Sequence, residues 1–372
     1  MIPFSKPYTP SSASEHINQA LNSLIQQGDG SYSKLIERLV SEKYGASQLF
    51  LTPSCTAALE LSLMLLDIKA GDEVIIPSFT FTSVATAVTK FWATPVFCDI
   101  DTKTGCLDTD SLKELIGPKT KAISWVNYGG IIPEINHLKE LSRQFNIPLI
   151  EDAAHNFLVL GKGQHEPTGD FVTFSFHATK NFQCGEGGGL LVTNKEYIER
   201  AHVMREKGTN RRDFNRGVVS KYSWVDRGSS YLLAEINSAL LFAQLDEFEV
   251  IQRKRQEIVE SYAASLAEFE EINWSVLKGT EHSAHLFALL APNEQERSFL
   301  IKFLLEQDIV AVSHYQDLAS SPAGIRYADR NSNCINSQDF ASRIVRLPVF
   351  FELDFARQEI IVSTIKSFFR GK

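Results

Sequence analysis

One lysine, Lys180, lies between an apolar segment and a glycine-rich turn. The apolar segment ends at residue 176, and the turn carries glycine at positions 185, 187, 188 and 189. A lysine amine can form a Schiff base with an aldehyde, and glycine lets a ligand approach the backbone closely. Taken alone, such a lysine is most often a surface charge, and the glycines could simply make a turn. The interpretation therefore depends on which other groups reach the same place.

Two further features are predicted to reach the same edge of a sheet. Residues 147–150 form a short apolar segment that ends in Glu151-Asp152, and ligands of open α/β sheets bind beyond the carboxyl ends of the strands. Residues 52–58 lead into an apolar helix with Ser54 as a candidate N-cap, and the free amides of a helix N-terminus suit a phosphate. A lysine amine, a carboxylate for a pyridinium nitrogen and a helix terminus are the groups that hold pyridoxal phosphate (PLP). The combination predicts a PLP enzyme.

Simpler interpretations of the same residues remain open at this point. Asp152 could cap the following helix, and any helix can begin with serine or threonine. No general base is evident beside Cys55, which is expected to be a packing residue. His155 and His177 lack the spacing of metal ligands, so no metal site is predicted. The glycines do not match a dinucleotide fingerprint, because position 190 is leucine and the cluster precedes a strand.

Composition excludes several classes of protein. The net charge of −8 argues against binding to a nucleic-acid backbone, which normally requires a basic face. The five cysteines contain no C-x-x-C pair, so neither a disulfide framework nor a zinc knuckle is expected. No apolar run approaches the roughly 18 residues of a membrane span, and the first residues do not resemble a signal peptide. We expect a cytoplasmic protein that binds neither nucleic acid nor membranes.

Alternating short apolar segments and helical stretches predict an α/β fold. Seven such segments imply a mainly parallel sheet covered on both faces, with a long helical tract over residues 231–269. The chain after residue 274 reads as a smaller α+β unit with a long polar loop at 313–337. We expect a large domain with an N-terminal arm at 1–250 and a small C-terminal domain at 251–372. The seven predicted strands are 48–51, 73–76, 95–99, 122–126, 148–150, 171–176 and 190–193.

Taken together, several tracts resemble the sugar-nucleotide aminotransferases of the DegT/DnrJ/EryC1/StrS family, within the fold-type I PLP-dependent transferases. The resemblance extends over nearly the whole chain. It implies a PLP cofactor, a large domain with a seven-stranded sheet and a smaller C-terminal domain. The tracts that carry it are Ser54-Cys55-Thr56-Ala57-Ala58-Leu59-Glu60, residues 71–81, Glu151-Asp152-Ala153-Ala154, Ser175-Phe176-His177-Ala178-Thr179-Lys180-Asn181 and Gly185-Glu186-Gly187-Gly188.

The resemblance also implies roles for individual residues. Ser230 occupies the position of a family asparagine that reaches the phosphate from the other subunit, which implies a homodimer with shared active sites. His155 replaces a glutamine near the phenolic oxygen of the cofactor. The remaining roles are Lys180 as Schiff-base lysine and proton shuttle, Asp152 at the pyridine nitrogen, Phe81 and Ala154 on the two ring faces, and Thr56, Ala57 and Ser175 at the phosphate.

Within the family, the chain is most similar to the dTDP-4-amino-4,6-dideoxygalactose transaminases of the enterobacterial common antigen branch, which points to lipopolysaccharide and O-antigen sugars. The tracts that suggest this branch are 205–211, 228–232 and 320–324. The implied reaction moves an amino group from L-glutamate to a 4-keto-6-deoxyhexose nucleotide. Candidate contacts for that substrate are Lys207, Arg211, His314 and Tyr315, although a solvated charged face is an equal alternative for the two basic residues.

Three alternatives to this activity stay open. The enzyme could aminate C3, or produce the glucose epimer. A non-catalytic regulator or binding module with the same fold is a different class of protein, and the presence of both Lys180 and Asp152 disfavours it. The related sugar dehydratases carry histidine at the Schiff-base position, so Lys180 argues against that activity.

Overall fold

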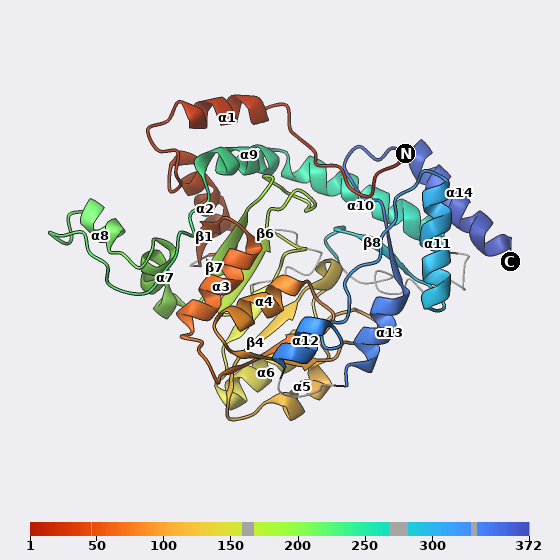
Figure 1. Ribbon diagram of the computed structural model, residues 1–372. Helices are drawn as coiled ribbons and strands as arrows, with labels where there is room; N and C mark the ends of the chain where they lie inside the picture. Colours follow the sequence, from red (N-terminus) through yellow and green to blue (C-terminus); the bar gives the residue numbers. More distant parts are fainter. Residues whose placement is uncertain (46, 158–166, 268–281, 329–332, 372) are drawn as a thin grey trace.

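A seven-stranded sheet forms the centre of the fold (Figure 1). The computed structural model describes residues 1–45, 47–157, 167–267, 282–328 and 333–371. The strand order is β1-β7-β6-β5-β4-β2-β3, in which β7 runs antiparallel to β1 and β6 and the other neighbours are parallel. The predicted mainly parallel sheet is confirmed. Its strands are β1 (Gln48–Thr52), β2 (Glu73–Pro77), β3 (Thr94–Cys98), β4 (Thr120–Val126), β5 (Leu149–Asp152), β6 (Phe171–Ser175) and β7 (Gly188–Val192).

Both faces of this sheet are covered, which explains why its strands are apolar throughout instead of alternating. In β2, Val74 and Ile76 pack into a core with α3 (Cys55–Leu65) and α4 (Thr82–Lys90). Ile75 points to the other face, because successive side chains of a strand alternate, and packs with α5 (Thr109–Leu115) and α6 (Ile135–Phe145). The helices therefore clamp the sheet from both sides and fix its strand ends.

The N-terminal helices and the first part of the long helical tract lie together at the β1 side of the sheet (Figure 1). The helices α1 (Ala13–Leu21) and α2 (Ser31–Tyr44) both pack against α9 (Glu235–Asp246). The long helical tract predicted over 231–269 consists of two helices in its described part, α9 and α10 (Phe248–Ser265), with the break at Glu247. Glu235 is buried and accepts the amides of Gly30 and Tyr32 at 2.9 and 3.0 Å, so it caps α2.

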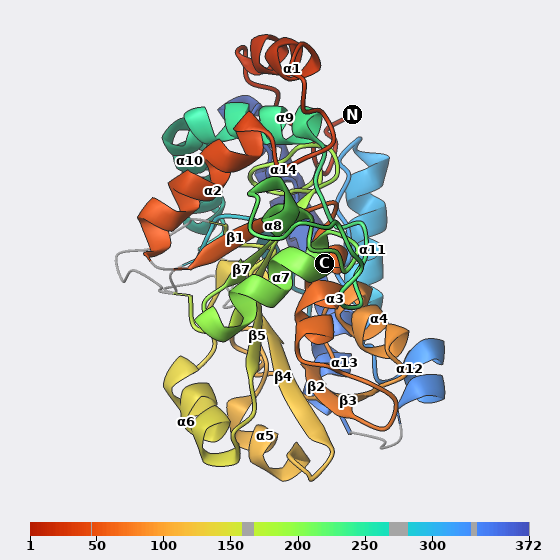
Figure 2. The ribbon, with the colours of Figure 1, turned by 90° about the vertical axis from the view of Figure 1, so that its left-hand side faces the viewer.

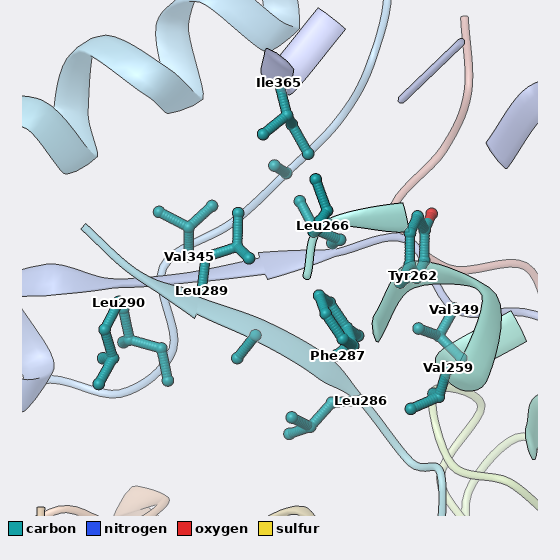
Figure 3. Packing of buried hydrophobic residues seen from close by; sticks show 14 of the residues in the cluster. Val259, Tyr262, Leu266, Leu286, Phe287, Leu289, Leu290, Val345, Val349 and Ile365 are labelled. Carbon is teal, nitrogen blue, oxygen red and sulfur yellow. The ribbon is translucent and has the colours of Figure 1, made fainter. Parts of the chain in front are cut away.

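The C-terminal part of the chain forms a second core around a two-stranded antiparallel sheet, β8 (Phe287–Leu290) with β9 (Ile344–Leu347). Figure 3 shows Tyr262 of α10 and Ile365 of α14 among the side chains packed with these strands. The predicted domain boundary at residue 250 falls inside α10, and the division into two domains stays a prediction. The helices here are α11 (Glu294–Glu306), α12 (Pro322–Tyr327), α13 (Ile335–Arg343) and α14 (Phe355–Arg370).

One expectation for this region was wrong in detail. Residues 313–337 are not loop throughout, because α12 begins within them at Pro322, where Ser321 caps the helix. Residues 309–312 do not form a strand of a sheet. They make isolated bridges instead, with Ile309 beside Ile2 of the N-terminal arm and Val312 beside Arg346. The arm is therefore attached to the C-terminal unit of its own chain.

One segment projects from the body of the molecule. It follows α7 (Ile198–Arg205) and contains α8 (Arg211–Asn215), which stands apart from the sheet in Figure 1 and faces the viewer in Figure 2. The large apolar side chains Phe214, Tyr222 and Trp224 on this segment are exposed. Short 3-10 turns occur at η1 (Tyr128–Gly130) and η2 (Lys195–Tyr197). Among the described residues, no helix is both long and apolar enough to span a membrane.

Candidate active site

A cavity of about 520 Å³ lies where the strand ends of the central sheet meet the C-terminal unit. The lysine and the carboxylate singled out by sequence, Lys180 and Asp152, both line it. Residues from α3, the β5 and β6 ends and the segment before α12 complete the wall. The other predicted site residues that line this cavity are Thr56, Phe81, Ala154, His155, Ser175, His314 and Tyr315.

Strand register explains how distant parts of the chain reach this cavity. Gly188 at the start of β7 lies opposite both Thr52, which ends β1, and Ser175, which ends β6. A β carbon on Gly188 would lie 2.3 Å from the carbonyl carbon of Ser54. Because Gly188 has no side chain, the start of α3 can pack against its backbone. The glycine cluster was expected to allow close approach of a ligand instead. Gly185, with a φ of +80° and open space around it, serves the turn.

Asp152 is the last residue of β5 and only 5% exposed. One carboxylate oxygen, Oδ1, accepts the amide of Ala154 at 3.0 Å, and residues 153–157 form turns with no helix, so Asp152 does not cap one. Burial raises the pKa of Asp152 to about 6, while the Ala154 amide and the charge of Lys180 act against that rise. A cationic partner, such as a protonated ring nitrogen, would favour the ionised form.

Lys180 carries an amine with a reduced basicity. Burial lowers its pKa to about 8, and the nearby charge of Asp152 opposes the shift. A lysine whose pKa approaches the working pH releases and recovers its proton readily, and its neutral form is a nucleophile. Of the charged residues in the cavity, these two therefore form the pair suited to carbonyl and proton-transfer chemistry.

The start of α3 offers donors for a phosphate. Ser54 Oγ accepts the amide of Ala57 at 3.1 Å, which leaves the amides of Cys55 and Thr56 at the free end of the helix dipole. Thr56 Oγ1 lies 2.7 Å from Ser83 Oγ, so two hydroxyls adjoin these amides. The expectation for Ala57 needs correction, because its amide is used by the cap and it does not line the cavity.

Hydrogen bonds fix the protonation state of His155. Its Nδ1 accepts the amide of Gly129 at 3.1 Å, so in the neutral ring the proton resides on Nε2, which lies 3.3 Å from the hydroxyl of Tyr315. Burial, followed by the charge of Lys180, lowers the pKa of His155 well below its ordinary value. The ring is therefore a neutral donor at neutral pH. Tyr315 itself has a φ of +54°, a strained conformation for an aromatic residue.

Three of the predicted site residues lie elsewhere in this chain. Ser230 is exposed at the base of the projecting segment, where its backbone forms an isolated antiparallel β-bridge with Glu206. Lys207 and Arg211 donate to the carboxylate of the same Glu206 at 2.7 and 3.0 Å. These two cations are thus paired within the segment, and none of the three lines the cavity of its own chain.

The cavity-wall residues that sequence analysis missed include Phe4, His285 and Arg346. The ring of His285 stacks on His155 with centroids 4.2 Å apart, and its Nδ1 donates to Asn181 Oδ1 at 2.9 Å. Phe4 comes from the N-terminal arm, for which the sequence carries no chemical signal. Arg346 did leave one, because it is a charged residue inside the otherwise apolar run Ile344 to Phe350.

These residues fit pyridoxal phosphate. The α3 start with Thr56 and Ser83 presents amides and hydroxyls suited to the phosphate, while the buried carboxylate of Asp152 lacks a strong counter-ion other than Lys180. Phe81 is 56% exposed although it lines the cavity, so an apolar face is available to a planar ring. Lys180 supplies the amine for a covalent link to the aldehyde.

Comparison with known proteins finds a family model and a relative that match most of this chain. A model of the DegT/DnrJ/EryC1/StrS aminotransferase family matches residues 9–366. An uncharacterized protein of Methanocaldococcus jannaschii is 30% identical over 363 residues, which cover 93% of each chain.

Solved structures extend the likeness to the whole fold. A putative sugar aminotransferase from Streptococcus pneumoniae in its PMP form is 27% identical, covers 100% of both chains and gives a TM-score of 0.90. Its PLP form is 26% identical with a TM-score of 0.88, covering 100% of this chain and 99% of that one. PseC of Helicobacter pylori, an aminotransferase involved in pseudoaminic acid biosynthesis, covers 100% of both chains with a TM-score of 0.90 at 23% identity, which shows the shared fold.

Proposed function

We propose that this chain, which belongs to the DegT/DnrJ/EryC1/StrS aminotransferase family, transfers an amino group from L-glutamate to C4 of dTDP-4-keto-6-deoxy-D-glucose. The product is a dTDP-4-amino-4,6-dideoxyhexose with the galactose configuration. The coarser statement is established by the family: the protein is a PLP-dependent sugar aminotransferase. The observation that carries the proposal is the meeting of Lys180 and Asp152 in one cavity beside the α3 start.

Each part of the cavity has a task in this reaction. When bound, pyridoxal phosphate supplies an electron-accepting ring and an aldehyde carbon that takes up and passes on the amino group. Asp152 holds the ring nitrogen protonated through its buried carboxylate. The Lys180 amine removes a proton from the carbon that bears the donor's amino group, and returns a proton to C4 of the sugar in the second half-reaction. Such acid–base work contributes roughly 10²–10⁴-fold to the rate.

Several side chains orient the bound groups and exclude water. Phe81 and Ala154 would hold the ring of the cofactor, and the neutral His155 could donate from Nε2 to its phenolic oxygen in place of the contact with Tyr315. The amides of Cys55 and Thr56, with the hydroxyls of Thr56, Ser83 and Ser175, hold the phosphate. His314 and Tyr315, whose rings stack at 3.6 Å, form the wall that faces the sugar.

The choice of nucleotide, carbon and epimer rests on sequence resemblance to the common antigen branch. Incubation of the enzyme with L-glutamate and dTDP-4-keto-6-deoxy-D-glucose, followed by NMR of the product, tests it. An axial amine at C4 supports the proposal. An equatorial C4 amine or a C3 amine overturns the substrate assignment. A protein that binds PLP but leaves glutamate unchanged overturns the proposed donor, and one that reacts with no amino donor is a non-catalytic binding module.

The active site is proposed to be complete only in a homodimer. Ser230, Lys207 and Arg211 lie on the projecting segment and not in their own chain's cavity, and exposed aromatic residues on that segment are typical of an interaction surface. We expect the segment to enter the partner's cavity, where Ser230 adds a donor for the phosphate.

Subunit mixing tests the shared site. Lys180→Ala removes the amine, and Ser230→Trp blocks the segment, so each variant alone is expected to be inactive. In a mixed dimer one cavity combines an intact Lys180 with an intact segment from the partner, so activity should reappear after subunit exchange. A Lys180→Ala and Asp152→Ala mixture is the control and should stay inactive, because both residues line the same chain's cavity and each cavity of the mixed dimer then lacks one of them. Verified exchange without recovered activity in the first mixture contradicts the shared site.

A further inference from the structure

Arg346 is a buried guanidinium on the wall of the active-site cavity. It lies in β9 and is 8% exposed, although a guanidinium keeps its charge at any ordinary pH. Its Nε has no hydrogen-bond partner, and within the described residues no carboxylate forms an ion pair with it. Its guanidinium carbon lies 4.9 Å from the centre of the Phe4 ring, which covers one face of the cation.

A second buried arginine shows what a structural role looks like in this chain. Arg255 is 5% exposed, and its Nε and Nη2 donate to the carbonyls of Ala284 and His285 at 3.1 and 2.7 Å. Arg255 does not line the cavity. Arg346 has the same burial without such acceptors, and a buried charge without a partner is destabilising. We therefore expect the buried, unpaired guanidinium of Arg346 to form its ion pair with a bound ligand.

The surroundings indicate which ligand this is. The phosphate donors belong to α3 and its neighbours in the central sheet, whereas Arg346 belongs to the two-stranded sheet of the C-terminal unit. The phenols of Tyr128 and Tyr315 lie near the guanidinium but are neutral, since burial raises the pKa of both above the ordinary value. The charge of Arg346 also lowers the pKa of Lys180, so an anion bound at Arg346 would lie close to the reacting amine.

We infer that Arg346, backed by Phe4, binds a carboxylate of the amino-acid donor and so selects the donor for the first half-reaction. A planar guanidinium matches a carboxylate through two parallel hydrogen bonds, which a lysine cannot reproduce. The inference rests on the proposed function, because it assigns a partner to the same cavity. It adds a residue from the C-terminal sheet that determines specificity for the amino donor.

Equilibrium binding of glutarate to the holoenzyme tests this assignment. Glutarate carries the two carboxylates of glutamate but no amine, so it binds without reacting, and calorimetry reports its Kd. We expect Arg346→Met to raise that Kd at least about tenfold, with Arg346→Lys in between, because hydrogen bonds to charged groups are lost. The matched control is Arg255→Lys, which alters an equally buried arginine and should leave the glutarate Kd within about twofold.

A second arm separates carboxylate from phosphate binding. The Kd of dTDP should stay the same in Arg346→Met, and an equal loss of affinity for dTDP and glutarate would overturn the assignment. Unchanged glutarate affinity in a folded Arg346→Met protein overturns it as well. If that variant does not fold, Arg346→Lys and Phe4→Leu carry the test, and wild-type affinity in both refutes the inference.

Failure of the inference is distinct from failure of the proposed function. Mixing wild-type holoenzyme with L-glutamate should change its visible absorbance in a single turnover. No change in the wild-type protein contradicts the proposed donor. A normal wild-type change together with an unaltered glutamate dependence in Arg346→Met contradicts only the role of Arg346.

Discussion

Replacement of Lys180 by methionine is expected to stabilise the cofactor-free protein while it abolishes catalysis. In the chain without ligand, the amine of Lys180 is held in a cavity where burial lowers its pKa from 10.5 to about 8. Methionine has a similar length and no charge, so it fills the same space without desolvating a cation. The buried amine of Lys180 is therefore expected to lower the stability of the cofactor-free protein.

The magnitude and its pH dependence follow from the two pKa values. Because the folded-state pKa lies below the unfolded value, folding disfavours the protonated amine, and this cost is complete below pH 8 and disappears as pH rises through 10.5. At 1.36 kcal/mol per pKa unit the cost at pH 7 is about 3 kcal/mol. Lys180 is partly exposed and its loss leaves Asp152 without a partner, so we expect a net gain of about 1–3 kcal/mol. By pH 9.5 the gain should fall to about half or less.

Thermal unfolding of cofactor-stripped protein at matched protomer concentration measures this difference. The midpoint of Lys180→Met should exceed that of the wild type at pH 7 by on the order of 1–4 °C, and the gap should narrow at pH 9.5. Lys302→Met is the control, because Lys302 is an exposed lysine of α11 and its replacement should show no such trend with pH. A wild-type protein that melts at or above the variant at pH 7, or a gap that does not narrow, refutes the reasoning.

Sequence alone predicted the central sheet because each strand is a short apolar run between helical stretches. All seven predicted strands lie within two residues of the observed ones at each end. Lys180 and Asp152 could be singled out for the same reason, since each follows a strand, and a parallel sheet gathers its strand ends at one edge. The local sequence pattern was therefore enough to predict those site residues that lie next to a strand in the sequence.

The rest of the site depends on contacts that local pattern does not encode. Glu235 caps α2 from a position 205 residues away from Gly30, so neither helix shows the connection in its own sequence. The helical periodicity of 231–269 continues through Glu247 although the helix breaks there. Arg346 is visible in the sequence as a charge inside an apolar run, but its place in the site follows only when the C-terminal sheet and the arm with Phe4 line the cavity.

The basic tract shows how pairing in space limits what a sequence indicates. Lys207 and Arg211 look like free cations in the sequence and were considered as contacts for a diphosphate. The structure pairs both with Glu206, which is 8% exposed and lies between them. Whether a charge is available to a ligand is decided by its neighbours in space, and the adjacent Glu206 was the signal that could have indicated the pairing.

Two further substitutions address the remaining parts of the cofactor site. Gly188→Ala should weaken PLP binding by about 1–3 kcal/mol, because its β carbon would meet the Ser54–Cys55 backbone at 2.3–2.4 Å and displace the start of α3. Gly185→Ala has open space for its β carbon but a φ of +80°, so it is the control for backbone strain without a clash, and equal PLP affinities of the two variants by fluorescence titration would contradict the packing argument. Asp152→Asn keeps an acceptor for the Ala154 amide but removes the charge, so the ring nitrogen is no longer held protonated. The single-turnover reaction with L-glutamate should slow by about 10²-fold or more, as on loss of one electrostatic stabiliser, while PLP remains bound through the phosphate. Stopped-flow absorbance measures this rate, and a wild-type rate in a folded, PLP-loaded Asp152→Asn protein would show that the buried carboxylate has no part in the chemistry.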